Sequence, residues 1–183
     1  MISLNNLPTH KKQKEVLLDR IEKYKLKKNC LVAKSYDIHK ETNRVYSDFQ
    51  FSNPEQMFKD DFFEHKELVE LLANIGMSMN MNVFGNFSVN RGNSCFRQYG
   101  KNAGQKWHNE SGTQFTNIYF LELPDEKYKT EICGLNGKLI EYEAEEGQIL
   151  TIPSFLLHRE KPNGPKRKTI ISFNTDYVSA KYG

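Results

Sequence analysis

Residues 106–123, KWHNESGTQFTNIYFLEL, hold two short runs that favour β-strands, Lys106–Glu110 and Phe115–Leu123. The second run is rich in the aromatic and β-branched residues that suit a pleated sheet. Similar runs, separated by turn residues, continue to the end of the chain. Many short strands without a strand–helix–strand rhythm predict a closed or two-sheet β architecture such as a jelly roll. The further runs are Ser94–Tyr99, Glu131–Gly134, Lys138–Ala144, Ile149–Ile152 and Lys168–Thr175.

The first 76 residues have a different sequence pattern, in which two helices are predicted. Lys14–Lys27 predicts an amphipathic helix whose buried side carries Val16, Leu17, Ile21 and Tyr24 at helical spacing. A second helix is expected from about Pro54 or Asp60 to Ile75, with Gly76 as its stop. We expect both helices to pack outside one sheet of a single domain, in which residues 1–76 support a jelly-roll core formed by residues 77–183. Further expectations are short strands at 31–36 and 45–51 and a hairpin turn at Asn136-Gly137.

The composition of the 183 residues is that of a soluble globular protein, with 38% hydrophobic and 27% charged residues and a net charge of +3. No run approaches the roughly 18 apolar residues of a membrane helix, and the first residues lack the apolar core of a signal peptide. Cys30, Cys95 and Cys133 are far apart and not in metal-binding spacing. We therefore expect free thiols and a cytoplasmic location.

The motif His-x-Glu occurs three times in the sequence. The secondary structure predicted around each copy decides which of them could bind a metal ion through both side chains. Residues i and i+2 share one face of a strand but diverge by about 200° on a helix. His65 and Glu67 fall in the second predicted helix, while His39 and Glu41 lie at a polar turn. His108-Asn109-Glu110 is the copy that lies on a predicted strand.

A third ligand candidate, His158, ends the apolar run Gly147–His158, which contains a Pro153-Ser154 corner. A lone histidine of this kind is more often a hydrogen-bonded core residue, but here it follows a His-x-Glu pair. Two histidines and a carboxylate are the ligands of a non-haem Fe(II) site that leaves part of the metal open. Arg167 follows nine residues later, directly before the strand-like run Lys168–Thr175.

These motifs together resemble the catalytic core of 2-oxoglutarate- and Fe(II)-dependent dioxygenases, in the prolyl-hydroxylase-like branch. The resemblance covers about 80 residues from Ser94 onward and leaves residues 1–76 unexplained. It implies a double-stranded β-helix, a jelly roll of cupin-like architecture. It also implies Fe(II), 2-oxoglutarate and O₂ as cofactor and cosubstrates, and hydroxylation of a C–H bond with release of succinate and CO₂.

Residue by residue, the resemblance makes His108, Glu110 and His158 the iron ligands. Arg167 matches the cation that holds the distal carboxylate of 2-oxoglutarate, and a guanidinium fork suits that contact. Lys168 is the alternative, because strand parity lets only one of the two point inward, and we favour Arg167. Tyr99 matches a tyrosine that hydrogen-bonds the cosubstrate, although a half-buried strand aromatic explains it equally well. The family usually has aspartate where Glu110 stands; any carboxylate there argues for hydroxylation over halogenation.

Two other functions remain open at this point. A nucleic-acid-modifying oxygenase would use the basic segments Lys11–Lys28 and Lys161–Lys168, although a solvated helix face is the simpler explanation of the first. A non-catalytic, cupin-like metal binder would keep the fold and the ion. The sequence does not name the substrate: a peptide side chain, an amino acid, a small metabolite and a nucleobase all fit.

Overall fold

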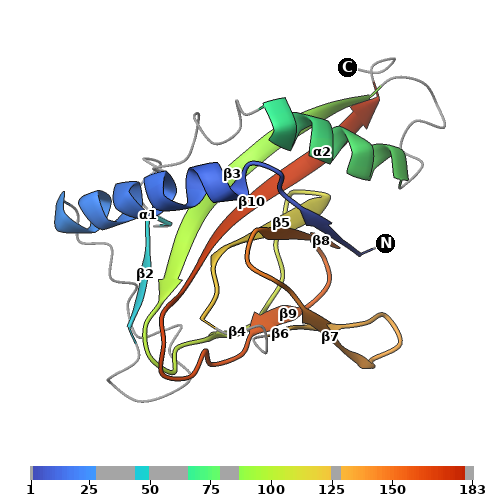
Figure 1. The fold of residues 1–183 in the computed structure, drawn as a ribbon. Coiled ribbons are helices and arrows are strands. Elements are labelled where there is room, and N and C mark those ends of the chain that lie inside the picture. Colours follow the sequence, from blue (N-terminus) through green and yellow to red (C-terminus); the bar gives the residue numbers. More distant parts are fainter. Residues whose placement is uncertain (1, 28–43, 50–65, 79–86, 125–128, 180–183) are drawn as a thin grey trace.

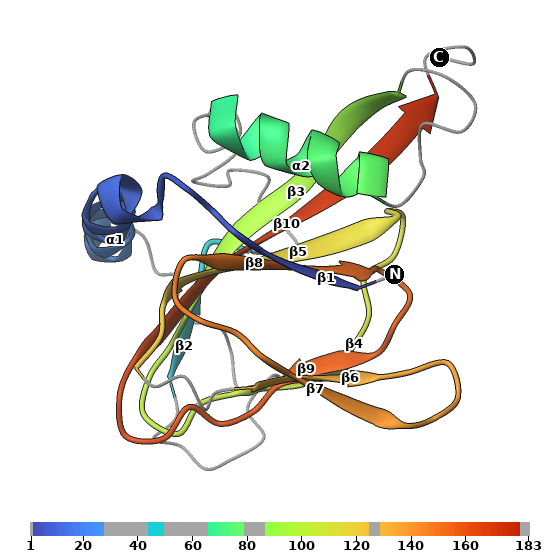
Figure 2. The same ribbon diagram turned by 45° about the vertical axis from the view of Figure 1, so that its right-hand side comes forward.

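The chain forms two antiparallel β-sheets, with both helices covering the outer face of one of them (Figures 1 and 2). The structure, a computed structural model, describes residues 2–27, 44–49, 66–78, 87–124 and 129–179. Within these residues the major sheet has six strands: β1 (Ser3–Asn6), β2 (Val45–Ser47), β3 (Phe87–Tyr99), β5 (Phe115–Glu122), β8 (Gln148–Pro153) and β10 (Lys168–Ser179). The four strands of the minor sheet are β4 (Gln105–His108), β6 (Lys129–Cys133), β7 (Leu139–Glu143) and β9 (His158–Glu160).

The strand orders are β1-β8-β5-β10-β3-β2 and β4-β9-β6-β7. Consecutive strands such as β4 and β5 lie in different sheets, so the chain winds between the two layers. This is the jelly-roll, or double-stranded β-helix, architecture that the sequence predicted. The expected helices and most of the expected strands are present within the described residues, and β1 and β9 are strands that the sequence pattern did not predict.

The longest pairing joins β10 to β3 and fixes which side chains face the space between the sheets. Lys168 is opposite Tyr99, and Ile170 is opposite Arg97. Directly paired residues of an antiparallel ladder lie on the same face, and neighbours along a strand alternate. Lys168, Arg97 and Tyr99 therefore face the interior together.

The outer face of the major sheet packs against α1 (His10–Lys27) and α2 (Lys66–Ser78). Ile21 of α1 and Leu68 of α2 are buried in one apolar cluster with Phe96 and Tyr119 of the sheet. A second apolar cluster lies between the sheets and includes Phe120, Ile132 and Ile152. Within the described residues, neither helix is long and apolar enough to cross a membrane.

Several boundaries differ from the predicted ones. The first helix begins four residues before the expected start at Lys14, and its Val16 is 59% exposed rather than buried. The second helix continues past Gly76 to Ser78, where the Ser78 hydroxyl donates to the carbonyl of Ile75. The strand predicted at 31–36 and the first part of the second helix lie outside the described residues, as do the last two residues of the 45–51 run, of which Val45–Ser47 form β2.

The predicted hairpin turn at Asn136-Gly137 joins β6 to β7. Gly137 has a φ of +74°, which glycine adopts without strain. The Asn136 side chain accepts a hydrogen bond from the backbone N–H of Lys138 at 3.0 Å. The sequence predicted this turn because the geometry of a turn depends on a few adjacent residues.

The packing of α1 gives a direct test of the outer core. Ile21→Ala should lower the free energy of unfolding by about 2–4 kcal/mol, because it leaves a cavity in a fully buried site. Val16→Ala, on the exposed side of the same helix, should change it by less than about 0.5 kcal/mol. Urea denaturation of both variants measures the difference, and equal effects would contradict the placement of α1.

Candidate metal centre

His108, Glu110 and His158 converge at one point between the two sheets. One ligand atom from each of the three side chains lies within 4.8 Å of the others. The two imidazole rings are 4.2 Å apart between centroids, and His108 Nε2 is 3.8 Å from a carboxylate oxygen of Glu110. The antiparallel pairing of β4 with β9 causes this convergence, because it sets His108 directly opposite His158.

Both histidines are held so that the same ring nitrogen is presented to the site. Nδ1 of His108 donates to the carbonyl of Lys106 at 2.9 Å, and Nδ1 of His158 donates to the carbonyl of Leu156 at 3.0 Å. With Nδ1 protonated, Nε2 of each ring carries a lone pair. Metal-binding histidines are commonly oriented by such a contact of the second ring nitrogen.

The surroundings of His108 favour its neutral form. Burial, followed by the neighbouring His158, lowers the pKa of His108 to about 3. A neutral imidazole is the form that binds a metal ion. The ring is therefore ready to bind a metal at neutral pH without first losing a proton.

Glu110 reaches the site from just beyond a strand, not from within it. β4 ends at His108, two residues earlier than the predicted run. The backbone N–H of Glu110 nevertheless donates to the carbonyl of Ser154 at 2.9 Å, in the connection that leads to β9. This hydrogen bond ties Glu110 to the segment that delivers His158.

A cavity of about 260 Å³ opens beside the triad. His108 and Glu110 line it, together with Arg97 and Cys95 of β3 and Gln105 of β4. A smaller cavity behind it reaches His158 and Glu160. Burial raises the pKa of the Cys95 thiol to about 11, so this thiol stays protonated and serves as a small apolar wall residue.

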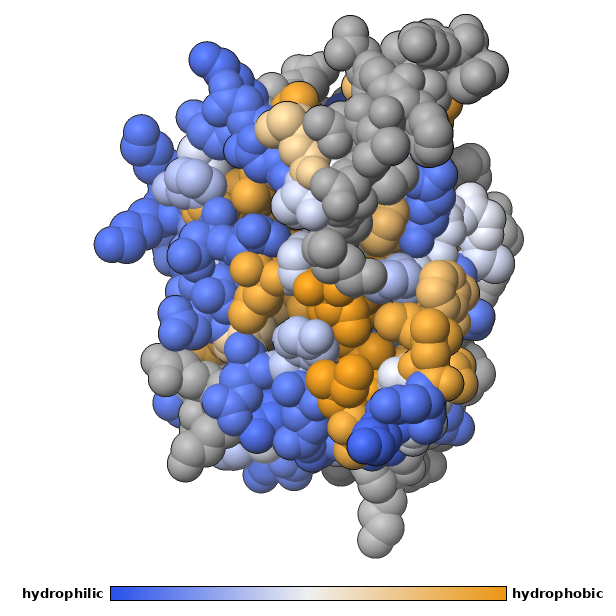
Figure 3. Space-filling view, turned by 90° about the vertical axis from the view of Figure 1, so that its right-hand side faces the viewer, coloured by the Kyte–Doolittle hydropathy of each residue, from blue (hydrophilic) through white to orange (hydrophobic). Residues whose placement is uncertain are grey.

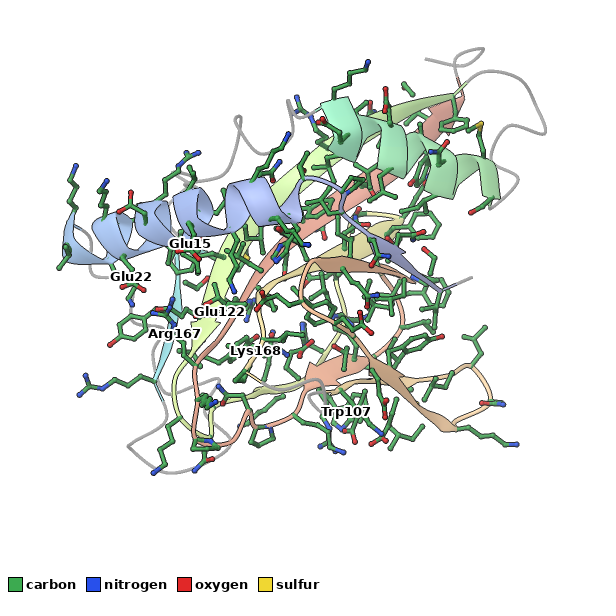
Figure 4. All side chains as sticks on the ribbon, in the orientation of Figure 1. Glu15, Glu22, Trp107, Glu122, Arg167 and Lys168 are labelled. Carbon is green, nitrogen blue, oxygen red and sulfur yellow. The ribbon has the colours of Figure 1, made fainter. Side chains whose placement is uncertain are left out.

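The structure corrects the preference for Arg167 as the inward cation. Arg167 lies on the outside of the major sheet, where its guanidinium binds the carboxylates of Glu122 and Glu22 at 2.8 Å (Figure 4). Lys168, the alternative, points between the sheets and is 1% exposed. Its ammonium is paired with the buried carboxylate of Glu160.

Tyr99 also lies inside, and it belongs to a short hydrogen-bond chain that leads to the triad. Its hydroxyl donates to the side-chain carbonyl of Gln105 at 2.9 Å. The amide nitrogen of Gln105 then donates to Nε2 of His108, also at 2.9 Å. Burial raises the pKa of the Tyr99 phenol, which keeps it a hydrogen-bond donor.

Of the other two His-x-Glu pairs, which the predicted secondary structure did not favour as metal ligands, His39, Glu41 and His65 lie outside the described residues. His10, on α1, is far from the triad in sequence and contacts Tyr119 and Glu146 on the helix-covered side.

No family model matches the sequence, and none of the curated proteins matches it. Solved structures do match. A Pseudomonas putida prolyl-4-hydroxylase is 10% identical with a TM-score of 0.60, covering 96% of this chain and 91% of that one. The viral collagen prolyl hydroxylase of Paramecium Bursaria Chlorella virus-1, in a 2OG complex, is 11% identical with a TM-score of 0.58, covering 97% and 96%.

A third match is a Burkholderia pseudomallei oxidoreductase described as a 2OG-Fe(II) oxygenase. It is 8% identical with a TM-score of 0.61, covering 96% of this chain and 84% of that one. This chain shares the fold of the prolyl-hydroxylase-like oxygenases. At such low identities the likeness concerns the fold, which the sequence resemblance had also predicted.

Three residues that face the space between the sheets were not predicted from the sequence. Arg97 shares strand parity with Tyr99, so the strand predicted at Ser94–Tyr99 already implied that both face the same way. Gln105 precedes the predicted start of its strand by one residue. Glu160 shares parity with His158, but β9 was not predicted, so nothing indicated its direction.

Exposed apolar side chains also gather on the face near the β6–β7 hairpin and the loop before β9 (Figure 3). They include Leu135, Leu139, Ile140, Phe155 and Leu157. This surface adjoins the segment that carries His158.

The single tryptophan, Trp107, lies next to His108 and provides an internal reporter of metal binding. It is 38% exposed, and its ring stacks against Arg159 at 4.7 Å. We expect Fe(II) added without oxygen to quench its fluorescence in a saturable way. His158→Ala should weaken this binding by more than the ~10- to 100-fold that loss of an outer contact causes. His10→Gln, at a histidine away from the triad, should bind Fe(II) as the unmodified protein does; equal weakening in both variants would refute the site.

Proposed function

We propose that the protein is a non-haem Fe(II)- and 2-oxoglutarate-dependent dioxygenase that hydroxylates a C–H bond of its substrate. The observation that carries the proposal is the convergence of His108, Glu110 and His158 beside a cavity within this fold. The ligand types fit Fe(II): two imidazoles and a carboxylate leave part of the metal open for other ligands.

The chain's own residues would bind, orient and shield the reactants. Nε2 of His108, Nε2 of His158 and the Glu110 carboxylate would hold the iron. Tyr99 and an interior cation would hold the cosubstrate. When bound, iron, O₂ and 2-oxoglutarate supply the oxidising chemistry, with succinate and CO₂ as the other products, and the protein contributes geometry and electrostatics.

The protein environment suits this task because the ligands differ in exposure. His158 is 2% exposed and lies at the floor, whereas the side chains of His108 and Glu110 are 25% and 34% exposed towards the opening. A small molecule entering the cavity would therefore meet the open side of the metal. Ile118 and Ile170 of the apolar cluster between the sheets line the smaller cavity beside His158, and apolar walls of this kind disfavour water.

The nucleic-acid alternative loses support because the basic segments carry their own counter-charges. In the segment 161–168, Lys161 pairs with Glu131 and Glu141, and Lys168 is buried. On α1, Lys14 pairs with Glu146 and Lys25 with Glu22. Surface pairs such as these reduce the field available to phosphates.

No feature of the described cavity identifies the substrate. The names of the matched proteins suggest which substrates to test first. Two of them are named as prolyl hydroxylases, one of these for collagen. Proline in a peptide is therefore the first substrate to test, followed by free amino acids and nucleotides.

The reaction can be tested before a substrate is known. Fe(II), 2-oxoglutarate and O₂ should give slow succinate release from the unmodified protein, which a non-catalytic metal binder would not do. His108→Ala should abolish this release because the iron loses a ligand. Lys138→Ala, on the β6–β7 turn away from the centre, serves as the control. Full succinate release by the His108→Ala protein would refute the proposed function.

Glu110 is the atypical ligand, and its substitutions separate charge from reach. Glu110→Asp keeps the carboxylate and should retain Fe(II) binding, with succinate release lowered by up to about tenfold because the shorter side chain shifts the ion. Glu110→Ala should lose most of the release. Comparison of both variants by Trp107 quenching and succinate assay makes the distinction, and equal activity of Glu110→Ala and the unmodified protein would exclude Glu110 as a ligand.

A further inference from the structure

Lys168, the inward cation of β10, already has a carboxylate partner inside the protein. Lys168 and Glu160 are 1% and 2% exposed, and their charged groups are paired directly. Glu160 also accepts a hydrogen bond from the Thr130 hydroxyl at 2.7 Å. An incoming carboxylate would have to displace this partner and leave Glu160 charged, buried and unpaired, which is strongly unfavourable.

The pair also spans the two sheets. Glu160 belongs to β9 and Thr130 to β6, both in the minor sheet, whereas Lys168 belongs to β10 in the major sheet. The rings of Tyr99 and Phe120 flank the ammonium at 5.7 and 5.5 Å. Lys168 does not line either of the two cavities described at the triad. Its surroundings are those of a structural contact.

Among the described residues, Arg97 is the cation that lines the cavity itself. It lies on β3 opposite Ile170 and borders both the larger and the smaller cavity, together with His108 and Glu110. Cys95 and Tyr99 are among its neighbours. A guanidinium has five N–H donors in a planar fork, so it can serve such neighbours and a carboxylate together.

Gln105 places a second donor on the same wall. The Tyr99 hydroxyl fixes the amide by donating to its oxygen, so the amide nitrogen is directed at Nε2 of His108. A metal ion at Nε2 takes the lone pair that now accepts this N–H. The amide would then donate to whatever ligand binds the metal beside His108.

We propose that Arg97, with the Gln105 amide beside it, holds the carboxylate of the cosubstrate in this cavity, and that Lys168 and Glu160 form a structural pair. This assignment rests on the proposed function and deepens it. It departs from both cations, Arg167 and Lys168, that the sequence resemblance offers. It also explains how the cavity could bind a carboxylate although Lys168 is already paired with Glu160, the residue two positions after His158.

The test compares 2-oxoglutarate binding to Fe(II)-loaded proteins without oxygen, by calorimetry and by the visible charge-transfer band. Arg97→Gln should raise the dissociation constant about 10- to 100-fold, as loss of a charged partner at a desolvated contact does. Arg167→Gln makes the same chemical change on the outer face and should leave the constant within about threefold. The double variant Lys168→Met/Glu160→Gln removes both charges of the structural pair together and should also stay within about threefold.

Fe(II) binding, followed by Trp107 fluorescence, shows that each variant keeps its metal centre. Arg97→Lys keeps the charge without the fork and should fall between the unmodified protein and Arg97→Gln, which covers the case of a poorly folded glutamine variant. An Arg97→Gln constant within threefold of the unmodified protein would overturn the inference. A large loss in the Lys168→Met/Glu160→Gln variant would do the same and return the role to Lys168.

Failure of the proposed function gives a different result. If the Fe(II)-loaded protein binds no 2-oxoglutarate, succinate and acetate are titrated into the Mn(II)-loaded protein. Saturable binding of either that is lost in Arg97→Gln supports Arg97 as a carboxylate site for another reaction. Absence of any carboxylate binding overturns the inference itself.

Discussion

The antiparallel pairing of β10 with β3 is the constraint on which the interior depends. Side chains alternate between the two faces of a strand, so one register decides every residue along both strands. Because Lys168 is opposite Tyr99 and Ile170 is opposite Arg97, these side chains face inward. Their neighbours along the strands face the helices: Gln98 accepts a hydrogen bond from Lys25 of α1 at 2.5 Å, and Arg167 reaches Glu22 of the same helix. A slip of one residue would exchange the two sets completely.

The second constraint is the pairing of β4 with β9, which brings into contact residues that are far apart in the sequence. His108 and His158 are 50 positions apart, yet they are direct partners across the minor sheet. The hydrogen bond from the Glu110 amide to the Ser154 carbonyl extends this proximity beyond the end of the strand. The triad is thus held by backbone hydrogen bonds, and the backbone carbonyls of Lys106 and Leu156 fix its rings. A centre that relies on the main chain in this way can tolerate large sequence divergence around it.

The sequence predicted the jelly roll and named the three residues that converge, because strand-forming runs and His-x-Glu are local patterns. It did not determine the direction of Arg167 and Lys168. In a strand with one solvent-exposed face, the alternation of polar and apolar residues would have shown which of the two side chains points inward. β10 instead has apolar side chains on both faces: Ile170 packs between the sheets and Ile171 packs under the helices. The predicted burial of Val16 failed for a related reason, since the periodicity of α1 does not show how wide its covered stripe is.

The interior also shows why a buried ion pair can specify a site without binding anything. Separating the partners of a buried ion pair is strongly unfavourable because each charge is left uncompensated, so the pair of Lys168 and Glu160 favours the arrangement of the sheets in which it forms. Lys168, Glu160 and Thr130 connect the sheets behind the triad, and the hydrogen bond from Tyr99 to Gln105 connects them a second time. These links set the distance between β3, which carries Arg97, and β4, which carries His108. The same distance decides whether a small acid can touch the metal and the guanidinium at once. The ion pair of Lys168 and Glu160 would in this way fix the shape of the cavity that Arg97 lines.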